Sequence, residues 1–89
     1  MMKYNLKELK QAAEEACLSA YQNKELIDGC INWADLHCLT AKKYEDDDGV
    51  TGYEVIIEEA DPSQSDLHIF IDGFLRKRGY EGIETIFEW

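Results

Sequence analysis

The stretch DPSQSDLHIFIDGFLRKRG, residues 61–79, has the pattern of an amphipathic helix with start and stop signals at its ends. Asp61 can accept hydrogen bonds from the free N–H groups of a first turn, and Pro62 suits the first helical position because it has no N–H to lose. Apolar residues then recur at helical intervals: Leu67, Phe70, Ile71, Phe74 and Leu75. A cationic run followed by Gly79 is typical of a helix C-terminus. These signals predict a helix over residues 62–78.

A second helix is predicted over residues 6–23, where the apolar face consists mostly of alanines. Asn5, followed by Glu8 at the spacing of a capping box, marks its start. Small side chains such as Ala13 and Ala16 leave room for a neighbouring element. We therefore expect this helix to lie close to the element that it packs against.

Three further segments alternate apolar and polar side chains, as strands with one buried face do. They lie at residues 33–44, 53–59 and 83–89. Residues 45–52, between the first two strands, are rich in aspartate and glycine, which favours a hairpin loop. The predicted element order is therefore αββαβ.

The length of the helix at residues 62–78 limits the topology. It is roughly 25 Å long, enough to carry the chain back along the sheet, so the last strand should run parallel to the second. Parallel neighbours joined by a right-handed crossover are possible, but placing the first strand between these two makes every pairing antiparallel. We therefore predict an α+β fold, with an antiparallel three-stranded sheet in the order 2-1-3 and both helices on one face. Residues 1–89 should form a single compact domain.

The chain is strongly acidic, with 9 lysines and arginines against 19 aspartates and glutamates and a formal net charge of −10. A direct nucleic-acid binder needs a basic surface to neutralise phosphates. The only dense basic run, Arg76-Lys77-Arg78, falls where a helix end favours cations. The composition therefore argues against direct nucleic-acid binding and is compatible with a basic protein partner.

The N-terminal sequence and the cysteines indicate a cytoplasmic protein. The first residues are charged throughout and lack the apolar core of a signal peptide, and no stretch approaches the length of a membrane span. Cys17, Cys30 and Cys38 form no CxxC pair, and any disulfide would leave one of them over. We expect reduced thiols and no membrane contact.

The acidic hairpin does not match a standard calcium-binding loop. If Gly49 is the glycine of an EF-hand loop, the first and last ligand positions fall on Tyr44 and Val55, which cannot ligate calcium. A weaker calcium site remains an alternative, with ligands Asp46, Asp47 and Asp48. Zinc is not expected, because the neighbours His37 and Cys38 should point to opposite faces of their strand.

No catalytic arrangement is recognisable. The serines at positions 19, 63 and 65 lie outside any nucleophile elbow, and the chain has no glycine-rich phosphate loop. Neighbouring carboxylates such as Glu58 and Glu59 alternate between faces of a strand and cannot share one substrate. We therefore expect a non-enzymatic protein without a cofactor.

The strand pattern predicts a sheet face free of helices, with apolar residues inside an acidic rim. Its members are Glu54, Ile56, Glu58, Glu84, Ile86 and Glu88. This arrangement is typical of a protein interface, although glutamates also keep an open sheet soluble and prevent edge pairing. We predict a protein-interaction domain that binds through this face and the acidic hairpin.

Two alternatives stay open for this surface. Carboxylates in rows can imitate nucleic-acid phosphates to a basic protein, which would make the chain a DNA-mimic inhibitor.

The second alternative depends on which face of the first strand is buried, the one with Leu36 and Cys38 or the one with Leu39 and Ala41. If Leu39 and Ala41 lie outside, the apolar patch would favour a homodimer through the open sheet face.

The helix predicted over residues 62–78 has two residues that packing within one chain does not explain. Ile69 lies opposite the apolar stripe and should be exposed. Gly73, in the middle of the helix, lowers helix stability by about 1 kcal/mol relative to alanine. Such a glycine indicates close packing of a neighbouring backbone or the approach of a partner.

Overall fold

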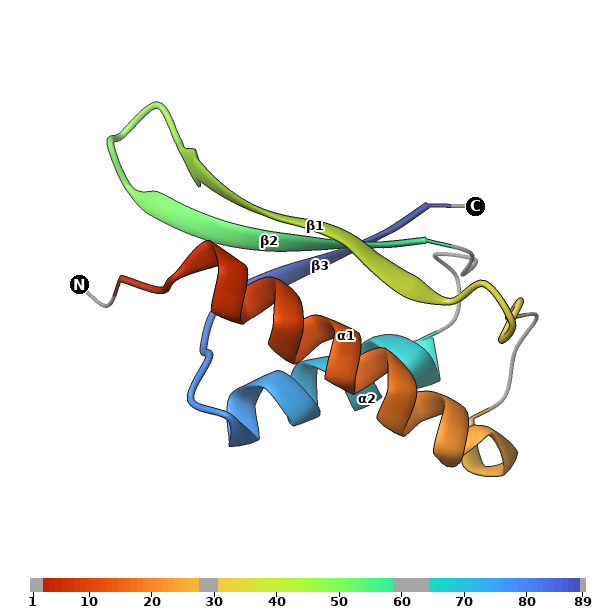
Figure 1. Ribbon diagram of the computed structural model, residues 1–89. Coiled ribbons are helices and arrows are strands. Elements are labelled where there is room, and N and C mark those ends of the chain that lie inside the picture. The colour runs from red at the N-terminus through yellow and green to blue at the C-terminus, as the bar shows by residue number, and fades with distance from the viewer. Residues whose placement is uncertain (1–2, 28–30, 59–64, 89) are drawn as a thin grey trace.

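The computed structural model describes residues 3–27, 31–58 and 65–88, and confirms the α+β class and the αββαβ order (Figure 1). The elements are α1 (Leu6–Gln22), a short 3-10 helix η1 (Lys24–Leu26), β1 (His37–Glu45), β2 (Thr51–Glu58), α2 (Ser65–Lys77) and β3 (Ile83–Glu88). Both helices lie on the same side of the sheet, as predicted.

The predicted strand order was wrong. The sheet is mixed and has the order β1-β2-β3, with β1 antiparallel and β3 parallel to the central strand β2. The direction of β3 was predicted correctly, but β3 pairs with β2 itself and not with β1. The physical reason lies in the side chains: Val55, Ile56 and Ile57 are consecutive and buried, as suits a central strand with a neighbouring strand along each edge. Exposed Lys42 and Lys43 suit β1 as an edge strand.

The core fills the space between the sheet and the two helices. Its largest fully buried side chains are Leu9, Cys38, Val55, Ile57, Leu67, Ile71 and Leu75. The alanine face of α1, including Ala13 and Ala16, is buried against β1 and α2, which confirms the close approach expected of small side chains.

A β-bulge resolves the ambiguous first strand. The register of β1 against β2 shifts between Cys38 and Thr40, so Leu39 is the extra residue. Cys38 and Ala41 are therefore both buried, although they are an odd number of positions apart, while Leu39 is 38% exposed. Neither of the alternating sets considered above describes this strand, because the bulge breaks the alternation.

Hydrogen bonds at the helix ends follow the sequence signals. The Asn5 side chain accepts a hydrogen bond from the backbone N–H of Glu8 and caps α1. At the end of α2, Gly79 has a φ of 92°, and the Tyr80 N–H donates to the Leu75 carbonyl in the pattern of a Schellman motif. The capping residues predicted at positions 61 and 62 lie outside the described residues.

One hydrogen bond joins β3 to α2, and its acceptor also contacts a histidine on the same helix. The Thr85 hydroxyl donates to Asp72 Oδ1 at 3.1 Å, and the other Asp72 oxygen lies 3.2 Å from His68 Nε2. Thr85 is the buried polar residue of the core, and this bond satisfies its hydroxyl. The odd-numbered side chains of β3 therefore face the helices, and the even-numbered ones face away.

Candidate functional site

The face of the sheet away from the helices has three cross-strand rows, because the strands pair in register. Lys42 on β1, Glu54 on β2 and Glu84 on β3 form the first row. Thr40, Ile56 and Ile86 form the second, and His37, Glu58 and Glu88 form the third. The six strand residues predicted for this face therefore share it, and we call it the open face.

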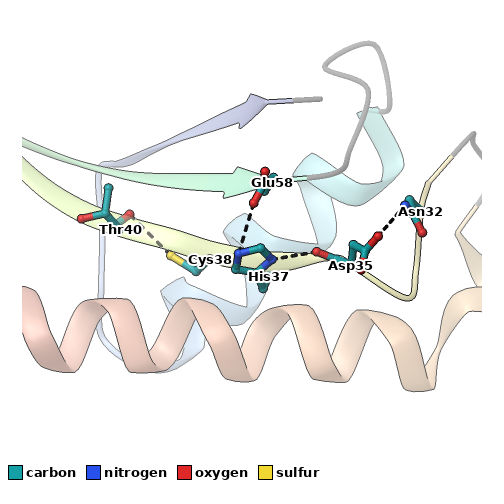
Figure 2. Close-up of polar contacts among 6 residues, drawn as sticks. All are labelled: Asn32, Asp35, His37, Cys38, Thr40 and Glu58. Atoms are coloured by element: carbon teal, nitrogen blue, oxygen red, sulfur yellow. Dashed lines mark hydrogen bonds and ion pairs between the residues drawn. The ribbon is translucent and has the colours of Figure 1, made fainter.

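Charge on the open face is unevenly compensated. Glu54 lies opposite Lys42 on one side, and the Glu58 carboxylate lies 3.2 Å from His37 Nε2 (Figure 2). On their other side, the same two residues lie opposite Glu84 and Glu88. Like charges directly opposite one another destabilise a sheet. The β3 side of the face therefore has an excess of negative charge that a cation from outside would offset.

The apolar centre of the face is smaller than the sequence indicated. Ile56 is 8% exposed, and Ile86 is half-buried. The surface that a partner meets is therefore mainly the carboxylates of the first and third rows, with a narrow apolar strip between them. Such a surface depends more on charge than on apolar burial for recognition.

His37 is held in place from two sides. Its Nδ1 lies 2.7 Å from the Asp35 carbonyl oxygen, while the Asp35 carboxylate accepts a hydrogen bond from the Asn32 side chain at 3.0 Å (Figure 2). Its Nε2 faces Glu58 on the open face, as described above. This network fixes the end of β1 next to β2, so the third row is held in a defined geometry.

Cys38 lies on the other face of β1 and is buried with Cys17 in the core. Burial, with a smaller effect from Glu14, raises the pKa of Cys38 to about 11. Burial, followed by Cys38 and Glu14, raises the pKa of Cys17 to about 12. Both thiols are therefore protonated at neutral pH, and neither is an activated nucleophile.

The acidic hairpin projects beyond the helices (Figure 1). The Asp46 carboxylate accepts hydrogen bonds from the backbone N–H groups of Asp48 and Val50, at 2.9 and 2.8 Å. Asp46 thus shapes the loop, as aspartate does in an Asx-turn. The side chains of Asp47 and Asp48 are exposed and extend the negative surface past the end of the sheet.

Three side chains of β1 on this surface were missed by the sequence analysis: His37, Thr40 and Lys42. The bulge at Leu39 places them on the open face, and the sequence has no clear signal for a bulge there. The ring of Tyr44 lies across Gly52, where a Cβ would overlap it. The missing side chain at Gly52 therefore lets the Tyr44 ring cover β2 at the base of the hairpin.

The part of the chain that the structure describes contains no group of three or more His, Cys, Asp or Glu side chains placed to hold a metal ion. None of the helices in the same residues is both long and apolar enough to span a membrane. No protein-family model, curated protein or solved structure matches the chain. The function of the chain is therefore inferred from the geometry and charge of the open face.

Proposed function

We propose that this chain is a non-enzymatic protein-interaction domain that binds a basic segment of another protein across its open face. The observation behind the proposal is the pairing of Glu54 with Glu84 and of Glu58 with Glu88, on either side of an apolar strip. Placing these carboxylates opposite one another does not stabilise the free monomer. A bound partner with lysine or arginine side chains offsets the repulsion.

The proposed binding mode follows from the spacing of the rows. Residues two apart on a strand lie roughly 6.6 Å from one another, so the outer rows are roughly 13 Å apart. Arginine or lysine side chains at the two ends of a short extended segment can reach both carboxylate pairs. An apolar residue between them meets Ile86, while the acidic hairpin adds a long-range attraction to the approach.

This geometry favours a basic partner over a second copy at the same face. Stacking two open faces would bring acidic rows together, so we do not extend the homodimer prediction for this surface. DNA mimicry remains an alternative prediction. Lys42 interrupts the acidic surface in the first row, which favours a basic protein segment over a phosphate-like row. The calcium alternative loses support because Asp46 already accepts two backbone hydrogen bonds.

The proposal places the protein in the cytosol. Cys17 and Cys38 are free and buried in the core, which suits a reducing compartment. Partners of this class include any cytosolic protein with an exposed basic segment. The test therefore selects the partner from a mixture.

The proposal is tested by capturing partners from a lysate of the source organism on the immobilised protein, with elution by a rising salt gradient. The test variant, Glu84→Lys with Glu88→Lys, reverses the uncompensated charges on β3. The matched control, Glu8→Lys with Glu25→Lys, makes the same change in net charge on the helical side of the molecule. Ile56→Lys is unsuitable, because Ile56 is too buried for the variant to leave the fold intact.

We expect wild type and control to retain the same partner and the β3 variant to lose it, with elution at moderate salt because the contact is mainly electrostatic. If both variants lose the partner equally, binding depends only on net charge. If both retain it equally, the open face is excluded as the binding site. A captured nucleic-acid-binding protein that duplex DNA displaces would support the DNA-mimic alternative instead.

A further inference from the structure

The outer face of α2 has an unpartnered stripe of residues on the side away from the sheet. Asp66, Ile69, Gly73 and Arg76 follow one another at intervals of three, four and three residues, the spacing of a coiled-coil seam. The buried residues Leu67, Ile71 and Leu75 lie on the opposite side of the helix. Ile69 is 69% exposed. This stripe is therefore available to a partner and separate from the open face.

Gly73 leaves a hole in the middle of this stripe. A Cβ built at Gly73 would meet no atom of the described chain within 4 Å, so packing among the described residues does not require glycine there. The backbone is helical, so no unusual dihedral angle requires it either. Glycine at such a position in a helix is unfavourable unless another helix approaches it closely. Neither packing nor backbone geometry among the described residues therefore accounts for Gly73, and the approach of a second helix would.

Charge along the stripe is self-complementary. The first turn of α2 has Asp66, while its last turn has Arg76 and Lys77. Within the described residues, Asp66 and Arg76 form no ion pair. Suppose that two copies of α2 pack antiparallel, with the two-fold axis crossing the outer face at the level of residue 71 along the helix. Each Asp66 then lies opposite Arg76 of the other copy. The same axis places each Ile69 opposite Gly73 of the other copy, so that a knob enters each hole.

A groove beside the stripe enlarges the contact. Two adjoining pockets run along α2 on the side of α1 and share Asn23, Ile69 and Phe70 as lining residues. The pocket at the η1 end has a volume of about 310 Å³ and includes Leu26, which is 81% exposed. A helix packed along the stripe would cover the edge of this groove and bury part of the exposed Leu26 and Ile69 side chains.

We propose that this protein forms a symmetric antiparallel dimer through the outer face of α2, with a second copy of the chain as the occupant. A helix of this length is about 20 Å long, so the interface lies at the lower end of specific interfaces. We expect a dissociation constant in the micromolar range. Because each copy is strongly acidic, association strengthens as low salt is raised to physiological ionic strength and long-range repulsion is screened. The open faces stay free in this dimer.

The dimer is tested by sedimentation equilibrium of the full chain over a range of concentrations, with single charge reversals. Asp66→Arg gives a chain with two cations at the paired positions, and Arg76→Asp gives one with two anions. Each alone should dimerise about tenfold more weakly, because both symmetry-related contacts become repulsive. An equimolar mixture of the two variants should regain wild-type association, since every contact between unlike chains is then attractive.

Two more variants separate the interface from the fold. Ile69→Lys should abolish dimerisation while its circular dichroism spectrum stays that of the wild type, because Ile69 is outside the core. Val50→Lys is the matched control, since Val50 is a 56% exposed apolar residue in the hairpin loop. It should dimerise like the wild type. A wild type that stays monomeric into the submillimolar range, a dimer that survives Ile69→Lys, or a mixture that fails to recover would each overturn the proposal.

Discussion

The opposed carboxylates on the open face predict that Glu84→Lys stabilises the free protein. Glu84 lies opposite Glu54 on the neighbouring strand. Adjacent strands are about 4.8 Å apart, and two charges roughly 5.5 Å apart in water interact by about 0.7 kcal/mol. Glu84→Lys replaces this repulsion by an attraction. Salt screening and the loss of side-chain entropy reduce the gain at an exposed pair, so the free energy of unfolding should rise by about 0.5 to 1 kcal/mol.

The assay is urea denaturation of wild type, Glu84→Lys and Glu25→Lys, at low and at high salt. Glu25→Lys makes the same change in net charge at an exposed site in η1, so it measures the general benefit of a less acidic chain. We expect the denaturation midpoint of Glu84→Lys to exceed that of Glu25→Lys at low salt, and the difference to shrink at high salt. Equal midpoints at low salt would refute the reasoning, because the cross-strand pair would then have no cost.

Three further substitutions or conditions test the fold. Gly73→Ala should raise the free energy of unfolding by about 1 kcal/mol in thermal or urea denaturation, because the added methyl group meets no atom of the described residues. A lower free energy of unfolding would show that the methyl group clashes with a packed neighbour. Gly52→Ala should destabilise by about 1 kcal/mol by displacing the Tyr44 ring, and the loss should be smaller in a Tyr44→Ala background. Stability should fall as pH rises above the ordinary thiol pKa of 9.0, towards the raised values of about 11 and 12. The folded thiols hold their protons more tightly than the unfolded ones, so the slope is about 1.4 kcal/mol per pH unit for each thiol; Cys17→Ala should reduce it, and an unchanged slope would contradict the assignment.

The helices could be predicted from the sequence because their signals are local. The Asn5 cap, the cationic last turn of α2 and Gly79 act within a few residues of the helix ends. Strand order depends instead on contacts between distant segments. The run Val55-Ile56-Ile57 would have identified the central strand, since all three residues are buried. Chain direction alone favours β1 at the centre, because that order makes every pairing antiparallel, but it takes no account of which side chains are buried.

The open face could be predicted in part. Alternation along β2 and β3 placed six of its residues correctly, because a strand without a bulge keeps its two faces apart. The contribution of β1 could not be predicted, because the bulge at Leu39 shifts the alternation. The alignment of Glu54 with Glu84 and of Glu58 with Glu88 also required the structure, since register depends on the pairing of β3 with β2. These alignments are the basis of the proposed function.

The measurement that tests the central claim most directly uses isoleucine methyl groups as reporters. The protein is labelled at its isoleucine methyls, and their NMR spectrum is recorded as the captured partner is added. Ile86 reports on the open face and Ile69 on the outer face of α2. We predict that the Ile86 signal, and to a lesser extent the more buried Ile56 signal, shifts or broadens while Ile69 is unchanged. A response at Ile69 with no change at Ile86 would show that the partner binds the helices, and the proposed function of the open face would be wrong.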